Sequence, residues 1–516
     1  MNRWLILPVL VPFLTAVLLA LLNGHPRLER AVNLVSCAGL TVFVYWLLGH
    51  VDAHGIQAMV IGGWFAPWGV AFVADRLAAI MLCLSMSVGT VVLVYTFFTV
   101  EPRQERYFFH PLLQVLLLGV NWSFITGDLF NLFVAYEVML LGSYGVMMVG
   151  ASKPQVRQTM AYIAINSIGS TLFVMGCGLV YATLGTLNMA DIAQRSAQLT
   201  GERAALVTAV SMLLMVVFAL KAAAFPVFFW LPDSYPIVPA GMNGYFAGML
   251  TKVGVYSLMR LFVLCFRQPG AELVLEVLLV LSGLSMLFGV LGALCQWEVR
   301  KILSWHIISQ VGYMLMGIGL AASGADVAQA GVVASIFCVV HNMVVKSSLF
   351  LIGGIAGRIS GSQKLSEMGG IAGLAPGVSI LFLVAAFSLA GMPPFSGFIA
   401  KFVLIRAGLA GGHGVVVFVS VVTSLCTLYS MSKIWNYAFW HAPSVSAPLG
   451  RYRAMMLPTA VLVLSSVLMG VVAEPFLRLA NDAARDLLDP RAYQEAVLLP
   501  IPEPTTAQTS RLGGVP

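Results

Sequence analysis

The sequence predicts an all-α, polytopic membrane protein, and three observations support this fold class. Of the 516 residues, 59% are hydrophobic and 9% are charged, whereas soluble domains carry roughly 25% charged residues. About fourteen apolar segments are long enough to cross a bilayer, which takes roughly 20 residues. Two of these segments, 206–230 and 380–407, combine prolines with a lysine, as expected for the broken helices of transporters built from two repeats.

The composition also limits the kinds of site to expect. The formal net charge of +7 is spread through short loops and the tail, so it carries topology information and gives no support for nucleic-acid binding. All seven cysteines fall in apolar segments without ligand-like spacing, which indicates packing residues and neither disulfides nor metal ligands. We therefore expect no metal and no cofactor, and a lipid bilayer as the surroundings.

The predicted organisation has five parts. They are N-terminal helices 1–3 with an interfacial hairpin (1–107), a first repeat of helices 4–8 (108–266), a second repeat of helices 9–13 (267–436), helix 14 (437–475) and a polar C-terminal tail (476–516). The hairpin should place Trp64 and Trp68 at headgroup level. In the tail we expect a short amphipathic helix over 477–488, followed by a disordered end.

Lys221 is the charge that most needs explaining. It lies near the middle of segment 206–230, where a lysine costs roughly 2.5 to 3.5 kcal/mol on insertion scales. Pro226 follows five residues later, removes a backbone donor and should break the helix beside the lysine. A titratable cation next to a broken helix is a common way to build an ion path.

Two carboxylates fall in the apolar part of the chain. Glu137 lies in the middle of a helix predicted over 127–150, and an ionised carboxylate there needs a cation such as Lys221 or Lys252. The alternative is a neutral glutamate that packs between helices. Asp75 opens the third helix, and the sequence leaves open whether it caps that helix or belongs to an ion path.

Further polar residues recur in the later helices. Lys252 lies near mid-depth of segment 241–265, whereas Arg260 lies nearer its end and should snorkel. His306 shares a helix face with Gln310, although a lone membrane histidine is often a packing residue. His341 lies within about one and a half turns of Lys346, which favours a functional role for both.

The second broken segment has the opposite order of features. Pro393, Pro394 and Gly397 interrupt the helix, and Lys401 follows the interruption. Inverting one repeat relative to the other would bring Lys221 and Lys401 to comparable depth.

The distribution of basic residues predicts the orientation. Assuming fourteen spans, one set of loops holds most of the lysines and arginines and should be cytoplasmic, with both termini outside. That set contains Arg27, Arg30, Arg103, Arg106, Lys153, Arg157, Arg300, Lys301, Arg358, Lys364, Lys433, Arg451 and Arg453.

Taken together, the chain resembles the antiporter-like membrane subunits shared by Mrp-type monovalent cation/proton antiporters and respiratory complex I. The resemblance covers about 62–475. Its most specific pieces are GDLFNLFVAYEVMLLGSY, ALKAAAFPVFFWLPDSYP, KILSWHIISQVGYM, HNMVVKSSLF and AGMPPFSGFIAKF. The opening GGWFAPWGVAFVADRLAAIML looks most like the D-type subunits of Mrp antiporters.

The resemblance implies two inverted five-helix repeats and a pairing of Glu137 with Lys221. It also implies that proton transfer continues through residues matching Lys252, His341 with Lys346, and Lys401. The family works in multi-subunit complexes, so other membrane subunits are expected as partners. The short tail has no counterpart of the long lateral helix of the largest complex I subunit, which makes that subunit a poor match.

The leading hypothesis is a subunit of a Na⁺ or K⁺/H⁺ antiporter in a bacterial inner membrane, a transporter rather than an enzyme. The proton path would use Glu137, Lys221, Lys252, His341, Lys346 and Lys401, with Asp75, His306, Pro226 and Pro394 as secondary candidates. The nearest alternative is a proton-pumping subunit of a complex I-like oxidoreductase or membrane hydrogenase. A structural subunit without transport and a stand-alone carrier are two further hypotheses.

Overall fold

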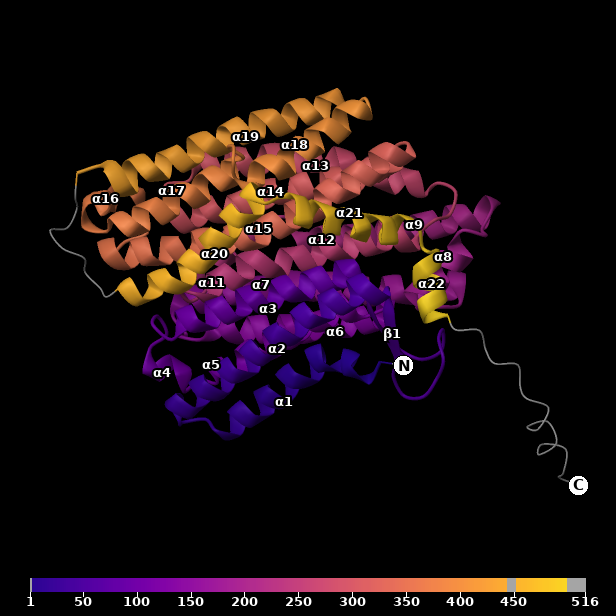
Figure 1. The fold of residues 1–516 in the computed structure, drawn as a ribbon, viewed down its shortest axis with the longest axis horizontal. Coiled ribbons are helices and arrows are strands. Elements are labelled where there is room, and N and C mark those ends of the chain that lie inside the picture. The colour runs from indigo at the N-terminus through magenta and orange to yellow at the C-terminus, as the bar shows by residue number, and fades with distance from the viewer. Residues whose placement is uncertain (1, 443–451, 499–516) are drawn as a thin grey trace, which may run out of the picture.

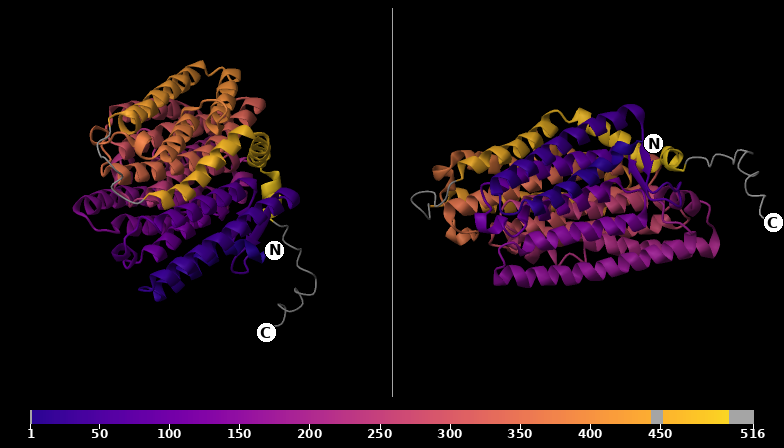
Figure 2. Two further views of the ribbon diagram at one scale, coloured as in Figure 1. Left: turned by 60° about the vertical axis from the view of Figure 1, so that its left-hand side comes forward. Right: turned by 90° about the horizontal axis from the view of Figure 1, so that it is seen from below.

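The computed structural model describes residues 2–442 and 452–498. Long helices lie side by side in one array along the longest axis of the molecule (Figure 1). The same near-parallel arrangement is seen from two further directions in Figure 2. Within the described residues, twelve helices are long and apolar enough to cross a membrane, and α5 (Phe109–Ile125) and α17 (Pro376–Ala390) are shorter apolar helices. The all-α membrane fold is therefore confirmed, while the number of about fourteen spans stays a prediction.

The N-terminal part combines three long helices with a small hairpin. It contains η1 (Arg3–Ile6), α1 (Leu7–Leu21), α2 (Pro26–His54), β1 (Gln57–Val60), β2 (Ala71–Ala74) and α3 (Arg76–Thr96). The strands pair antiparallel, with Gln57 opposite Ala74. Trp64 and Trp68 lie in the connecting loop and are 71% and 74% exposed, in agreement with an interfacial hairpin.

The middle of the chain supplies two successive groups of helices. The first group contains α4 (Pro102–Glu105), α5 (Phe109–Ile125), α6 (Leu129–Met148), α7 (Lys153–Leu184), α8 (Met189–Ser196), α9 (Gly201–Ala222), α10 (Leu231–Ser234), η2 (Tyr235–Ile237), α11 (Met242–Tyr245), η3 (Phe246–Leu250), α12 (Thr251–Met259) and η4 (Arg260–Cys265). The second contains α13 (Ala271–Cys295), α14 (Val299–Gly319), η5 (Leu320–Ala322), α15 (Ala325–Ser360), η6 (Leu365–Glu367), α16 (Ile371–Leu374), α17 (Pro376–Ala390), α18 (Ser396–Ala410), α19 (Gly414–Ile434) and η7 (Trp435–Trp440).

The C-terminal part begins with α20 (Arg453–Val471). The predicted boundary at 436 falls inside η7, and α20 starts well after that boundary. The predicted amphipathic helix is present as α21 (Glu474–Leu488), which packs against α15 and α3. A further short helix, α22 (Arg491–Val497), was not predicted. The prediction of a disordered end concerns 499–516, which lie outside the described residues.

Both predicted helix breaks are present, and their backbones match. After α9, Ala223 has a φ of 57° and the Ala224 N–H donates to the Ala219 carbonyl at 2.8 Å. After α17, Gly391 has a φ of 88° and the Met392 N–H donates to the Phe387 carbonyl at 3.1 Å. This is the Schellman pattern that ends helices, with the left-handed residue in the same place. The prolines then keep the chain from returning to the same helix.

Each of the two groups of helices also contains an equivalent backbone pairing outside its helices. The residue before α6, Asp128, pairs with Asn188, which follows α7. In the second group Glu298 precedes α14 and pairs with Lys364, which follows α15. Five apolar helical segments lie in each group, an odd number, so a repeated unit would be inverted in the membrane. These matches support the predicted division into two repeats, whose exact boundaries stay a prediction.

Candidate functional site

Glu137 and Lys221 are joined through a serine that the sequence reasoning missed. Glu137 lies half-buried on α6 and accepts a very short hydrogen bond from the Ser170 hydroxyl on α7. The Lys221 ammonium on α9 donates to the Ser170 oxygen at 3.2 Å. Within the described residues there is no direct ion pair between the two charges, so the expected pairing is replaced by a hydroxyl bridge. A hydroxyl that accepts from one side and donates to the other can pass a proton.

The rest of the Lys221 environment is neutral. Its ammonium also donates to the Asn166 carbonyl at 3.3 Å and lies 5.9 Å from the centroid of the Tyr136 ring. The side chain is 4% exposed. Pro226 follows in the break as predicted, and the Trp230 indole donates to the Leu220 carbonyl at 3.0 Å, which satisfies one carbonyl at the end of α9.

Lys252 is fully buried within its own helix. Its ammonium donates to the Ala247 carbonyl at 2.6 Å, five residues earlier, where η3 widens the helix into a π-helical turn. Such turns are rare and often lie at functional sites because they free a carbonyl from the regular ladder. The described contacts do not link Lys252 to Lys221 directly.

Lys346 occupies the centre of the second group of helices. It is fully buried on α15 and its ammonium lies 3.5 Å from the Leu303 carbonyl on α14. Its helix packs against the helix of Lys252 through Gly248 and Ser347, and against the start of α18, which carries Lys401, through His341 and Gly397. His306 on α14 lies within the influence of Lys346 and Lys401 and hydrogen-bonds to the Ser430 hydroxyl at 2.9 Å.

Lys401 lies at the second helix break. Its ammonium donates to the Leu389 carbonyl at 3.1 Å and to the Ala390 carbonyl at 3.0 Å, both at the carboxyl end of α17. It also lies 4.8 Å from the centroid of the Tyr313 ring. A cation is favoured there because the helix dipole is negative at its carboxyl end. Pro394 lies in the same break and is exposed.

His341 on α15 faces the start of α18. Its Nδ1 forms a hydrogen bond of 2.8 Å with the Ser396 hydroxyl. A side chain at Gly397 would collide with the His341 ring and with the Ser388 carbonyl, so only glycine lets α18 begin this close. The Nε2 atom of His341 is buried and has no partner in the described part of the chain.

Close glycine contacts connect the helices that carry these residues. Gly254 on α12 packs against Ala222 on α9, and Gly248 in η3 packs against Ser347 on α15. With Gly397 against α15, these contacts order the helices as α9, α12, α15 and α18. Small residues allow such close approach between membrane helices. The structure therefore brings Lys221, Lys252, His341, Lys346 and Lys401 onto neighbouring helices, and together these residues form the lysine row.

Asp75 belongs to a separate cluster. It caps α3 by accepting from the Ala78 N–H at 2.9 Å, and it accepts a hydrogen bond from the Arg260 guanidinium at 2.8 Å. Arg260 is 2% exposed, so the expectation that it snorkels was wrong: Asp75 and the Tyr256 hydroxyl provide buried partners instead. No described hydrogen bond joins this cluster to the lysine row, which favours the capping interpretation of Asp75.

Several of the contacts that the sequence did not predict come from hydroxyl groups. Ser170 shares a face with Asn166 at i,i+4 on α7, a polar pair inside an apolar segment that was available as a signal. Ser396 and Ser430 gave no such signal because serine is common in membrane helices and bonds to its own backbone.

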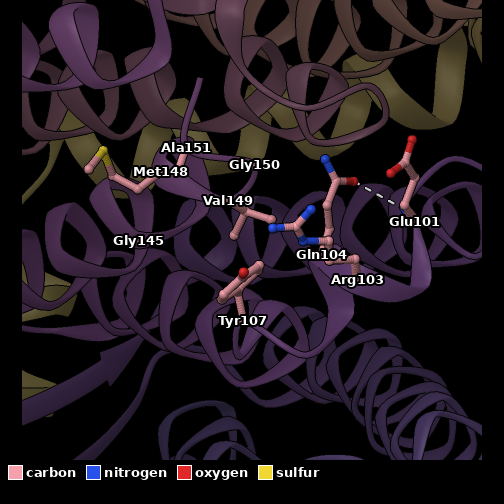
Figure 3. Close-up of a pocket in the computed structure, with 9 residues that line it drawn as sticks. All are labelled: Glu101, Arg103, Gln104, Tyr107, Gly145, Met148, Val149, Gly150 and Ala151. Carbon is pink, nitrogen blue, oxygen red and sulfur yellow. Dashed lines mark hydrogen bonds between the residues drawn. The ribbon is translucent and has the colours of Figure 1, made fainter. Parts of the chain in front are cut away.

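A surface pocket of about 460 Å³ lies away from this row. Figure 3 shows its nine lining residues, from the segment around α4 and from the end of α6, with Gln104 accepting from the Glu101 N–H. None of the nine is a member of the row. The pocket is therefore no part of the candidate site.

The comparisons with known proteins agree on one family. The family model for transmembrane subunits of NADH:quinone oxidoreductase and Mrp antiporters matches residues 126–427. The chain is 40% identical to the D-type subunit of the Na(+)/H(+) antiporter of Alkalihalophilus pseudofirmus, over 96% of this chain and 100% of that protein.

Two solved structures share the fold over nearly the whole chain. A chain of the Mrp complex from Dietzia sp. DQ12-45-1b gives a TM-score of 0.89 at 32% identity, covering 96% of this chain and 100% of that one. A chain of an archaeal membrane-bound sulfane sulfur reductase gives 0.86 at 25% identity, covering 96% and 99%. With the family model matching more than half of its residues, the chain belongs to the NADH:quinone oxidoreductase/Mrp antiporter family of membrane subunits.

Proposed function

We propose that this chain is the ion-translocating subunit of a multi-subunit Na⁺ or K⁺/H⁺ antiporter. The observation that carries the proposal is the row of buried lysines, with His341 and Glu137, on helices that pack against one another. Charged groups inside a membrane protein are costly, and they persist where an ion or proton path needs them. The greater identity to the relative named as part of a Na(+)/H(+) antiporter favours antiport over a redox-driven pump.

Each residue has a role in the proposed proton path. Glu137 and Ser170 hold the Lys221 proton at one end, and Lys252 and Lys346 carry it across the middle. Lys401 and His341 deliver it at the second break. Pro226 and Pro394 keep the broken backbone that holds water near the lysines. His306, which hydrogen-bonds to Ser430, is a secondary member of the path.

The proposal includes a location and an orientation. The protein lies in a bacterial inner membrane among other membrane subunits, with both termini outside. The sequence supports this orientation because basic residues concentrate in one set of loops. The division at 1–107, 108–266, 267–436, 437–475 and 476–516 belongs to the same proposal, with the fourth part adjusted to begin after η7.

Lys221→Ala tests the proposal. We expect it to abolish cation-linked proton movement in everted vesicles that contain the whole complex, because Lys221 is linked to Glu137 through the Ser170 hydroxyl. Lys153→Ala removes an exposed lysine at the start of α7 and should leave transport normal. Normal antiport in a stably inserted Lys221→Ala complex would contradict the proposed path and would favour a structural subunit.

The companions of the purified protein separate antiport from the redox-driven alternative. Small membrane subunits without redox groups are expected. Flavin or iron–sulfur subunits in the same complex would overturn the antiporter assignment.

A further inference from the structure

Three serine hydroxyls meet at the second helix break. Ser388 comes from the end of α17, Ser396 begins α18 and Ser466 lies on α20. Their oxygens are separated by 2.9 Å (Ser388 to Ser466), 3.1 Å (Ser396 to Ser466) and 3.3 Å (Ser388 to Ser396). All three side chains are buried. Each hydroxyl has one proton and two lone pairs, so this serine triangle keeps acceptor capacity beyond its internal hydrogen bonds.

The serine triangle lies next in sequence to two backbone carbonyls that bind the Lys401 ammonium. The carbonyls of Leu389 and Ala390 directly follow Ser388, and both accept from the Lys401 ammonium. Within residues 2–442 and 452–498, no carboxylate lies within ion-pair distance of Lys401. The positive charge at this break is therefore held by neutral oxygens and by the carboxyl end of a helix.

We propose that the serine triangle and the carboxyl end of α17 form a binding site for a monovalent alkali cation, with the Lys401 ammonium as its competitor. Hard cations prefer oxygen ligands, and neutral oxygens are sufficient for monovalent ions in membrane proteins. An ion over one face of the triangle would contact all three hydroxyl oxygens. The proposal rests on the proposed antiport function and assigns the cation side of it to this break.

Competition couples the two ions. Two positive charges held at the carboxyl end of the same helix repel where water is scarce, so a protonated Lys401 and a bound cation exclude each other. When Lys401 releases its proton, the ammonium becomes a neutral amine and one cation can enter. The charge at the break is the same before and after, because one positive charge leaves as another arrives.

Among the residues that the structure describes, the first break has no comparable group of hydroxyls. There Lys221 is tied to Glu137 through Ser170, and the Trp230 indole occupies a carbonyl at the end of α9. A carboxylate would neutralise the lysine, which removes the mutual exclusion that the second break provides.

The serine triangle has a second interpretation, as a relay for protons alone. The hydrogen bond between Ser396 and His341 connects the triangle to a titratable group. Other titratable side chains also surround Lys401. They are His306 and Tyr313 on α14, and Cys338, His341 and Lys346 on α15.

The concentration of cation that gives half-maximal antiport separates the two interpretations. We expect Ser466→Ala and Ser388→Ala to raise this concentration at least about tenfold, since a lost contact to a charged group costs that much or more. Their pH profile at saturating cation should match the wild type. Na⁺, K⁺ and Li⁺ are each titrated on everted vesicles with the complete complex, which identifies the preferred ion. Ser465→Ala is the matched control, because Ser465 lies outside the serine triangle and its hydroxyl donates to its own helix at Val461.

An unchanged half-maximal concentration in both variants, with an active complex, would reject the cation site and leave the proposed function intact. A changed pH profile with an unchanged half-maximal concentration would assign the triangle to the proton path. That result would also reject the cation site. A wild-type complex without antiport would instead reject the proposed function.

Direct binding tests the competition without transport. Binding of radioactive sodium or rubidium to the purified complex should weaken as the pH falls in the wild type, because protonated Lys401 competes. In Lys401→Ala we expect this pH dependence to flatten, with binding retained at low pH. Binding that stays equally pH-dependent in Lys401→Ala would show that Lys401 is not the competitor.

Discussion

At the scale of single residues, the site depends on serine hydroxyls that form hydrogen bonds with charged side chains and so link them. Ser170 stands between Glu137 and Lys221, so the two ends of this group communicate through one oxygen atom. A hydroxyl in this place keeps both charges close without letting them form a permanent ion pair. Such an arrangement lets the lysine release its proton when the carboxylate moves or is neutralised.

Ser170→Ala should therefore reduce antiport by about tenfold or more, since hydrogen bonds to charged groups contribute roughly 1.5–3 kcal/mol. Initial rates in everted vesicles measure the effect. Thr171→Ala is the control, because Thr171 is exposed and its hydroxyl donates to the Ser167 carbonyl of its own helix. Equal rates in the two variants would mean that Ser170 only packs.

Lys401→Arg separates a moving proton from a fixed positive charge. Arginine keeps the charge but is effectively never deprotonated, so we expect Lys401→Arg to lose antiport as fully as Lys401→Ala. Lys433→Arg should be tolerated, because Lys433 also donates to carbonyls at a helix end, those of Leu294 and Gln296, without a place in the row. Near-normal antiport in Lys401→Arg alone would give Lys401 a purely electrostatic role.

At the scale of secondary-structure elements, α20 holds the second break in place. A side chain at Gly470 would lie about 2.5 Å from the Pro394 carbonyl oxygen and from the Ser396 N–H nitrogen. These are backbone atoms of the break, so they cannot rotate away as a flexible side chain can. Because Ser466 lies one turn earlier on the same face, the packing of Gly470 also positions the serine triangle.

Gly470→Ala should push α20 off the break at a cost of about 1–3 kcal/mol, as overpacking usually does. We expect a lower melting temperature of the purified complex and a large loss of antiport. Gly283→Ala on α13 is the control, since no atom lies within 4 Å of the added carbon there. A Gly470→Ala complex with wild-type melting and transport would show that α20 does not fix the break.

At the scale of the whole molecule, the lysine row runs through a mostly apolar array of helices and is separate from the buried cluster of Asp75 and Arg260. The array is held by close glycine contacts, and the two breaks give the row polar backbone at both ends. The predicted orientation would place the loop between α13 and α14, with Arg300 and Lys301 in the first turn of α14, in the cytoplasm.

Cys295 reports this orientation. It is the exposed cysteine among the described residues and lies at the end of α13, next to that loop. A membrane-impermeant maleimide should label it in everted vesicles and not in right-side-out vesicles. Cys295→Ser should remove the labelling. Labelling from the outer side would reverse the proposed topology.

The sequence by itself determined the membrane fold, both helix breaks and the lysines that lie beside them. Apolar length, proline and a lysine in an apolar segment act through the local chain, so Lys221 with Pro226 and Lys401 with Pro394 could be found without neighbours. The tertiary structure decided which side chains form hydrogen bonds with one another. Ser170 reaches Lys221 across 51 positions of the chain, and Ser388 reaches Ser466 across 78. Arg260 was expected at the surface and instead lies buried against Asp75, 185 positions away. Hydropathy cannot indicate such contacts, because they depend on which helix faces meet, and that is set by the packing of the whole array.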